Sequence, residues 1–189
     1  LKSQSVHAPL RIMQSNGGTM GVGAAAARPV HIIESGPSAG VVGAAAIAAK
    51  LGFDNVLTFD MGGTTAKAAM IEAGRFGRVG DLDVGAGINF AARLLKGGGY
   101  HVSVPAIDIA EVGAGGGSLV RIDAGGALAI GPESAGAVPG PVCYDQGGHV
   151  PTVTDGNVVL GFVSPDYLVG GGLALDSTRA ARAIDEQRQ

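Results

Sequence analysis

The sequence has no tryptophan, and aromatic residues make up only 4% of its 189 residues. Because single-stranded nucleic acids are held largely by stacking on aromatic rings, this scarcity argues against a stacking platform. Charged residues are also few, at 15%, and a formal net charge of −3 gives no electrostatic reason to bind nucleic acid or an anionic membrane. A hydrophobic share of 46% at such low charge excludes a disordered tail.

Cysteine is nearly absent as well. Cys143 stands alone, which excludes an internal disulfide and a cysteine-cluster zinc site, and the four histidines lack the HxH and HExxH spacings of zinc sites. The longest apolar stretch, residues 39–49, is too short to cross a bilayer, and no secretory signal opens the chain. We therefore expect a cytoplasmic protein. The first residue is Leu1 and the last ten form a helix pattern without a stop signal, so we expect a longer polypeptide.

Glycine, by contrast, is abundant, with 34 residues, which indicates close backbone approaches. Hydrophobic patterns predict strands over residues 10–15, 55–60, 66–72, 100–109, 119–123 and 127–130, and a short strand or an extended linker over residues 30–34. They predict helices over 35–51, 88–96 and 152–160 and from 177 onward. The first of these helices begins near Ser35 and Pro37, ends at Gly52, and is apolar almost all round, which is typical of a buried helix. One α/β or α+β lobe over residues 1–189 is the simplest organisation.

The most specific local pattern is DMGGTTAK, residues 60–67, between two predicted strands. An acid such as Asp60 at the end of a strand can hold a magnesium-bound water. The pair Gly62 and Gly63 lets backbone N–H groups approach phosphate oxygens, and threonine hydroxyls and a lysine can add donors. An ordinary hairpin whose turn needs glycine explains the same residues.

A second glycine-rich segment, residues 112–118, follows the predicted strand 100–109, which has Asp108 near its C-terminal end. A mobile glycine loop behind a strand-end acid suits closure over a small ligand or its phosphate. It is not the dinucleotide fingerprint, because a strand follows it, and Ser118 is not in a nucleophile elbow. The alternative is a tight crossover in which the acid caps backbone N–H groups.

A third candidate is the segment 141–157. Cys143 and His149 would form a nucleophile–base pair if the fold brought them together, although a lone buried cysteine is more often a small core residue. Asp155 fits either a helix cap or an acid beside a metal.

Taken together, these motifs resemble the hydantoinase A/5-oxoprolinase family of the actin-like ATPase superfamily. The matching segments are MQSNGG (13–18), SGPSAGVVGAAA (35–46), DMGGTTAK (60–67), KGGGY (96–100), VGAGGGS (112–118), GPESAGAVPGPVCYDQGG (131–148) and PTVTDGNVVLG (151–161). Their order and spacing match over nearly the whole chain. The resemblance implies an α/β, RNase H-like lobe with a mixed sheet, a hairpin phosphate loop and flanking helices.

The same resemblance implies an enzyme that uses ATP and Mg²⁺ to open cyclic amides such as hydantoins and 5-oxoproline, by phosphorylating the amide oxygen. The alternatives are a subunit of an ATP-dependent ketone carboxylase and a sugar or acyl kinase lobe. The implied catalytic residues are Asp60, also the magnesium-side acid through water, and Asp108. The implied nucleotide ligands are Gly62, Gly63, Thr64, Thr65 and Lys67. The implied substrate-side residues are Gly115, Gly116, Gly117, Ser118, Cys143 and Asp155.

Two departures separate this chain from many relatives, which carry Asp at the position of Lys67 and His at that of Ala110. The family also has an N-terminal DxGGT phosphate loop and a later glycine motif near the adenosine, and neither occurs here. The resemblance therefore implies a central lobe with half of an ATP cleft and little turnover of its own. Its expected partners are the remaining lobes of the same chain, a cyclic amide substrate and a hydantoinase B-type subunit.

Overall fold

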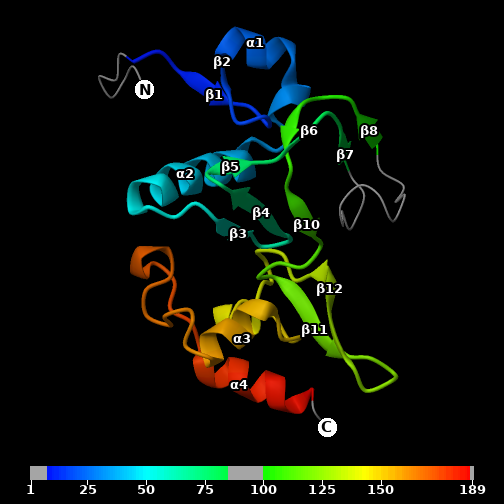
Figure 1. Cartoon of the computed structure of the whole chain (residues 1–189). Helices are drawn as coiled ribbons and strands as arrows, with labels where there is room; N and C mark the ends of the chain where they lie inside the picture. The colour runs from blue at the N-terminus through cyan, green and yellow to red at the C-terminus, as the bar shows by residue number, and fades with distance from the viewer. Residues whose placement is uncertain (1–7, 85–99, 188–189) are drawn as a thin grey trace. The chain divides into compact units, whose positions relative to one another are not determined.

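The computed structural model describes residues 8–84 and 100–187 (Figure 1). The chain divides into two compact units. The first unit comprises Leu1–Asp60 and Lys67–Ala110, and the second comprises Met61–Ala66 and Glu111–Gln189. The helix predicted over residues 88–96 lies outside the described residues.

Short strands and one long helix build the first unit. Its strands are β1 (Arg11–Met13), β2 (Thr19–Gly21), β3 (Val56–Met61), β4 (Ala66–Glu72), β5 (Arg75–Phe76), β6 (Arg78–Val79), β7 (Leu82–Val84), β8 (Tyr100–Val102), β9 (Ala106–Ile107) and, at the junction with the second unit, β10 (Ala110–Val112). Its helices are α1 (Val22–Ala27), the 3-10 helix η2 (Pro29–Ile32) and α2 (Ser35–Leu51). The largest sheet has the order β10–β4–β3, with β5 beside β4.

Helix α2 and the sheet enclose the core of this unit, in which Val41, Ala69, Ile71 and Ile107 are buried against one another. Figure 1 shows α2 running alongside β4 and β5. Ser15, fully buried, ties the start of α2 to β9, because its carbonyl oxygen accepts from Ser38 Oγ and from the Ile107 N–H, both at 2.8 Å. The MQSNGG segment therefore stabilises this unit by connecting α2 with β9.

Several predicted elements of the first unit are confirmed, and three expectations are wrong. Helix α2 ends where predicted, at Gly52, whose φ of 78° is left-handed, but its N-cap is Glu34 and only three of its residues are buried. The segment 30–34, predicted as a strand or an extended linker, falls mainly in η2, which begins at Pro29. The strand predicted over 100–109 is two strands, β8 and β9, separated near Pro105, which has no N–H to donate.

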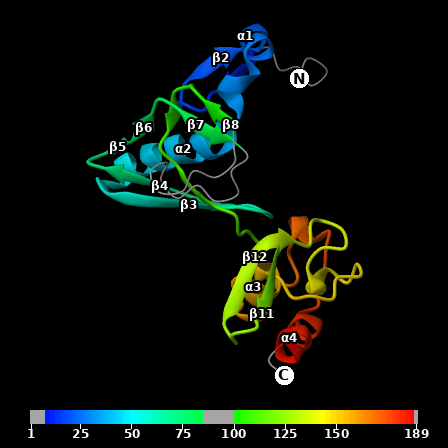
Figure 2. The ribbon, with the colours of Figure 1, turned by 90° about the vertical axis from the view of Figure 1, so that its right-hand side faces the viewer.

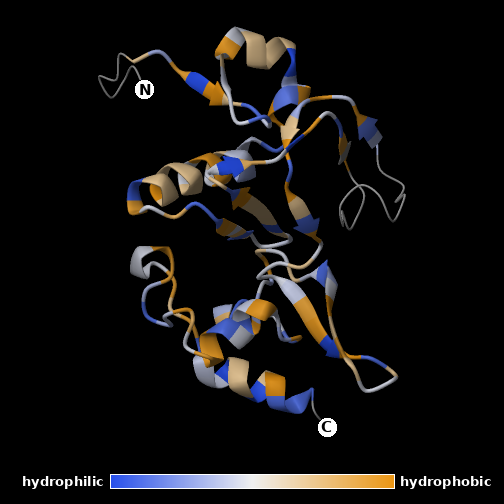
Figure 3. Ribbon diagram, viewed as in Figure 1, coloured by the Kyte–Doolittle hydropathy of each residue, from blue (hydrophilic) through white to orange (hydrophobic). Residues whose placement is uncertain are grey.

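The second unit combines a hairpin with two helices. Its elements are β11 (Ser118–Ile122), β12 (Leu128–Ser134), the 3-10 helices η3 (Val142–Tyr144) and η4 (Val169–Gly171), and the helices α3 (Val153–Val159) and α4 (Ser177–Glu186). Figure 2 shows the antiparallel hairpin β11–β12 beside α3. In Figure 3, apolar and polar colours alternate along α4, whose buried residues are Ala180 and Ala183. The core contains Cys143, Val158, Leu175 and Ala180.

Antiparallel pairing dominates both units. Five strand pairs are antiparallel: β1–β2, β4–β5, β6–β9, β7–β8 and β11–β12. The fold is therefore a mixture of helices with antiparallel sheets, and these pairs do not show the expected mixed sheet. The RNase H-like arrangement stays a prediction.

Candidate functional site

The turn between β3 and β4 is the first part of the site. Its ends are fastened by a hydrogen bond from the Gly62 N–H to the Thr65 carbonyl oxygen, at 2.9 Å. Gly62, Gly63 and Thr64 are all exposed. The strand–turn–strand unit predicted from DMGGTTAK is therefore present, and its glycines are at the surface of the second unit.

The glycine loop 113–118 contacts this turn directly. The Gly116 N–H donates to the Gly62 carbonyl oxygen at 2.9 Å, and the Gly117 N–H donates to the Gly63 carbonyl oxygen at 2.7 Å. The loop is closed by Ser118, whose Oγ accepts from the Gly115 N–H at 2.8 Å. Two segments about fifty residues apart in the sequence thus form one backbone structure.

Close approach explains why this loop is rich in glycine. A Cβ added to Gly115 would lie 2.6 Å from Thr65 N and 2.7 Å from Gly62 O. One added to Gly117 would lie 2.9 Å from Gly63 O. Gly115, Gly117 and Ser118 are buried. This packing argues against the mobile, substrate-facing loop that the sequence suggested, because its N–H groups and its space are already occupied.

The hydrogen bonds from the loop also determine where the turn's own N–H groups point. In a trans peptide the carbonyl and the following N–H point in opposite directions, and the cis peptides of the described chain precede Pro132 and Pro139. With the carbonyls of Gly62 and Gly63 directed at the loop, the N–H groups of Gly63 and Thr64 face away from it. Within the described residues, neither N–H donates to a protein acceptor. The turn thus has two adjacent N–H donors on an exposed segment.

Helix α3 contacts the glycine loop through hydrogen bonds to the Gly116 carbonyl oxygen. Thr154, in its first turn, donates twice to the Gly116 carbonyl oxygen, from its N–H and from its Oγ1, each at 2.8 Å. Sequence reasoning missed Thr154 as a residue of this site. The sequence does predict the helix start, but not the loop that this start meets.

The carboxylate of Asp155 lies at the centre of the second unit. Asp155 is 0% exposed and accepts from the N–H groups of Val142 (3.1 Å), Cys143 (2.7 Å) and Thr152 (2.7 Å), and from Thr152 Oγ1 (2.8 Å). Thr152 Oγ1 in turn accepts from the Asp155 N–H, which completes a capping box at α3. Of the two predicted roles, the helix cap is present, and full burial argues against a substrate-side role.

Cys143 is also fully buried, at 0% exposed. Burial, with the nearby Asp155 carboxylate adding to it, raises the pKa of its thiol to about 12. Because the thiolate is the nucleophile, a group held protonated in this way is inert. The substrate-side role predicted for Cys143, and its nucleophilic role with His149, are therefore not supported by the structure; Cys143 is a core residue.

We expect Cys143 to resist alkylation in the folded chain. At pH 8 a thiol with a pKa of about 12 is ionised in about one molecule in ten thousand, against several per cent or more for an ordinary thiol. Iodoacetamide labelling followed by mass spectrometry should show almost no modification in buffer and complete modification in denaturant. Rapid labelling of the folded chain would contradict the core assignment.

The predicted acids Asp60 and Asp108 and the cation Lys67 belong to the first unit. Both acids are exposed. Asp60 and Lys67 line a cavity of about 170 Å³ between α2 and β3–β4. Lys67 Nζ lies 2.6 Å from a Glu34 carboxylate oxygen, and both side chains are half-buried. Glu34 therefore competes with any phosphate for Lys67.

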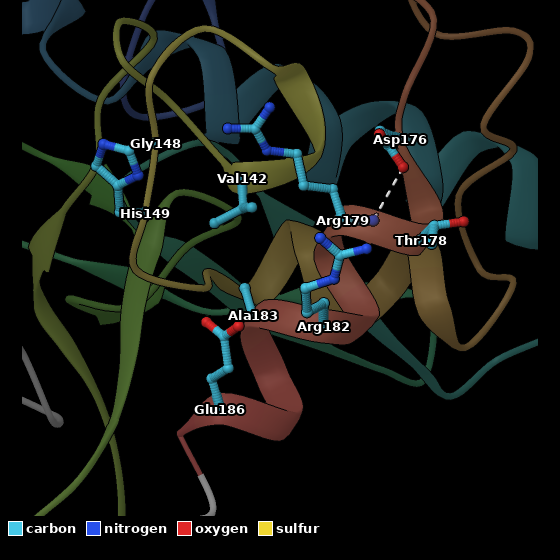
Figure 4. A pocket seen from close by; sticks show the side chains of 9 residues that line it. All are labelled: Val142, Gly148, His149, Asp176, Thr178, Arg179, Arg182, Ala183 and Glu186. Atoms are coloured by element: carbon cyan, nitrogen blue, oxygen red, sulfur yellow. Dashed lines mark hydrogen bonds between the residues drawn. The ribbon is translucent and has the colours of Figure 1, made fainter.

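A second cavity, of about 410 Å³, lies between α4 and the segment around His149 (Figure 4). Arg179 and Arg182 line it, but so do Asp176 and Glu186. Arg179 is also paired with Asp145. Charges of both signs therefore surround this cavity, and it has no clear preference for an anion or a cation.

In the described ranges, no group of three or more His, Cys, Asp or Glu side chains is placed to hold a metal ion. In the same ranges, no helix has the length and apolarity to span a bilayer.

Comparison with known proteins identifies the family. A profile of the family described as hydantoinase/oxoprolinase matches residues 1–188. The chain belongs to the hydantoinase/oxoprolinase family. It is 45% identical to a protein of Methanocaldococcus jannaschii over 98% of the chain and 27% of that protein. It is 40% identical to the caprolactamase subunit alpha of Pseudomonas jessenii, over 93% of the chain and 23% of that subunit.

Solved structures agree with this assignment. One is the nucleotide-free structure of acetone carboxylase, whose description names ATP-dependent acetone carboxylation. It matches this chain with a TM-score of 0.73 at 33% sequence identity, and the match covers 98% of this chain and 24% of that one. The ATP-dependent caprolactamase of Pseudomonas jessenii gives a TM-score of 0.72 at 38% identity, covering 97% and 25%. The chain therefore spans about a quarter of the length of the relatives it matches.

Proposed function

We propose that this chain provides a phosphate-binding turn of an ATP-dependent enzyme that opens cyclic amides. One observation carries the proposal: the N–H groups of Gly63 and Thr64 lie side by side on an exposed turn and face away from the loop that holds it. Successive N–H groups in a turn form a concave site for an anion. A Cβ added to Gly63 would find no atom within 4 Å, so the place that a side chain would take at Gly63 is open.

The relatives determine which anion the turn is proposed to bind. Both solved neighbours are described as ATP-dependent, one a caprolactamase and one an acetone carboxylase. When bound, ATP supplies a phosphoryl group that turns an unreactive amide oxygen into a leaving group. The part proposed for this chain is to hold and orient the phosphates, which is most of what phosphoryl transfer requires of a protein.

Four further residues are part of the proposal on the strength of the sequence motifs. Thr65 and Lys67 follow the two donors along the chain, and we include them as nucleotide ligands. Asp60 precedes the turn and carries an exposed carboxylate, which suits a Mg²⁺ ion held through water. Asp108, exposed at the end of β9, is the second proposed catalytic acid.

A pair of substitutions at Gly63 tests the turn directly. Gly63→Asp places a negative charge beside the two N–H donors, whereas Gly63→Asn adds a side chain of the same shape without charge. In the complete enzyme we expect Gly63→Asp to raise the KM for ATP about tenfold or more, because two like charges about 5 Å apart repel by about 3 kcal/mol at an effective dielectric constant of 20. Gly63→Asn should have a much smaller effect. Equal KM values for both variants would contradict phosphate binding at this turn.

A ketone carboxylase subunit is the second candidate, because the acetone carboxylase structure and the acetophenone carboxylase gamma subunit of Aromatoleum aromaticum, 36% identical over 99% of this chain, are also relatives. The proposed turn would serve either reaction. We suggest measuring ADP release by the complete enzyme with caprolactam, hydantoin and 5-oxoproline, and separately with acetone or acetophenone plus bicarbonate. Turnover of a cyclic amide supports the first candidate, and bicarbonate-dependent turnover of a ketone supports the second. The family match gives no support to a sugar or acyl kinase.

A further inference from the structure

We propose that Thr154 and the loop Gly115–Gly117 are positioning residues, which hold the turn Gly62–Thr65 in the one orientation that directs its N–H groups outward. The proposal rests on the function proposed above, since it concerns the same turn. It assigns to this loop a task different from substrate contact. The turn, the loop and Thr154 all belong to the second unit.

The loop holds the carbonyl groups of the turn. Rotation of the 62–63 or 63–64 peptide would exchange the directions of its C=O and N–H groups. Hydrogen bonds from Gly116 and Gly117 hold both carbonyl oxygens on the loop side, at 2.9 and 2.7 Å. Among the described residues, these are the hydrogen bonds that the turn receives from outside itself. Loss of either one would free its peptide to rotate.

Helix α3 holds the loop in turn. The first N–H groups of a helix have no partner within the helix. In α3 one of them, that of Thr154, donates to Gly116 O, and Thr154 Oγ1 donates to the same atom. The peptide of Gly116 therefore carries two hydrogen bonds from α3 on its carbonyl, while the N–H of Gly116 itself donates to the turn. Thr154 and the turn are joined through one residue.

Buried hydrogen bonds fix the beginning of α3. The beginning of α3 is fixed by the buried Asp155, which accepts from the N–H groups of Val142 and Cys143 as well as from Thr152. Strand β11 is attached at the same place, because the Val120 N–H donates to the Pro151 carbonyl oxygen at 2.8 Å. The turn is thereby connected to a buried and fully satisfied polar network. A site held by such a network keeps its geometry before the ligand arrives.

The proposal predicts that Thr154→Val weakens ATP binding without touching the nucleotide. This substitution removes the Oγ1 donor and keeps the branched shape, and Thr154→Ser keeps the donor. In the complete enzyme we expect Thr154→Val to raise the Kd for MgATP, measured by calorimetry, about three- to tenfold, which corresponds to one hydrogen bond. Thr154→Ser should restore affinity, and the KM for the amide substrate should stay unchanged in both variants.

A second variant acts from the other side of the contact. In Gly117→Ala, the added Cβ would lie 2.9 Å from Gly63 O and must push the turn. The control is Gly156→Ala, inside α3, where an added Cβ finds no atom within 4 Å. Hydrogen exchange of the complete enzyme should show faster exchange over residues 113–118 in Thr154→Val and Gly117→Ala, and no change there in Gly156→Ala.

These measurements separate the two proposals. If Gly63→Asp weakens MgATP binding but Thr154→Val and Gly117→Ala bind it with the wild-type affinity, the positioning role is wrong and the phosphate site stands. If Gly63→Asp leaves the affinity unchanged, the phosphate site itself is wrong. If Thr154→Val and Thr154→Ser weaken binding equally, or if melting temperature falls without any change in affinity, Thr154 is structural only. Weakened binding with rescue by serine supports the positioning role.

Discussion

Replacing Asp155 by asparagine is expected to lower the free energy of unfolding of the 189-residue chain by about 2–4 kcal/mol. One carboxylate oxygen of Asp155 accepts from Cys143, and the other accepts from Val142 and from both donors of Thr152. An asparagine side chain has one acceptor oxygen, so its NH₂ group must face at least one N–H in a fully buried place. Two donors that face each other without water leave both unsatisfied, which is the costly case.

The matched control is Asp176→Asn, which is the same substitution at another helix N-cap. Asp176 caps α4 through the Arg179 N–H at 2.9 Å, but it is exposed, and asparagine caps helices about as well as aspartate. We expect a change below about 0.5 kcal/mol there. Urea unfolding gives the free energies, and hydrogen exchange over residues 141–159 locates the change. Equal small losses at both positions would show that the four hydrogen bonds of Asp155 do not stabilise the unit.

Local patterns predict the parts of this fold whose causes are also local. The Gly-Gly turn between two β-rich segments is enough to place β3 and β4, and Gly52 is enough to end α2. Thr152 and Asp155, three residues apart before an apolar run, mark the start of α3, where the structure has a capping box. In each case the residues that determine the element lie within one or two turns of it.

Elements determined by distant contacts are predicted poorly. The alternating segment 100–109 appears as one strand, but the Ile107 N–H donates to Ser15, more than ninety residues earlier, and β9 pairs with β6. Helix α2 has an apolar sequence, and yet Ile47 and Leu51 are 61% and 65% exposed, because only one side of it meets the sheet. Composition shows which residues can be buried, and the fold decides which of them are.

The candidate site follows the same division. The turn pattern in the sequence identifies Gly62 and Gly63. Gly115 and Gly117 must be glycine because they pack against backbone atoms of that turn, which is about fifty residues earlier in the sequence. A glycine-rich loop is equally compatible with mobility and with close packing, so its sequence cannot separate a substrate lid from a support. Nothing in the sequence marks Thr154 as a residue of the site, because threonine is common near the start of a helix. Its role appears only when Gly116 is seen beside it.

Among substitutions of glycine by alanine in the second unit, we expect Gly115→Ala to weaken nucleotide binding most. Its Cβ would lie 2.6 Å from Thr65 N, 2.7 Å from Gly62 O and 2.7 Å from Thr64 C. All three are backbone atoms of the turn, so no side chain can rotate away to make room. The turn or the loop must therefore move by several tenths of an ångström. Overpacking of this kind costs about 1–3 kcal/mol.

Gly62 O belongs to the peptide that carries the outward Gly63 N–H, and the other two atoms form the Thr64–Thr65 peptide of the same turn. We therefore expect the Kd for MgATP of the complete enzyme to rise by about thirtyfold or more, equivalent to about 2 kcal/mol. Gly156→Ala is again the control, since its Cβ meets nothing within 4 Å and alanine favours the helix. The melting temperature should fall in Gly115→Ala and rise slightly in Gly156→Ala. If Gly115→Ala is folded and binds MgATP as tightly as the unchanged enzyme, then ATP does not depend on the geometry of this turn, and the nucleotide must be held elsewhere.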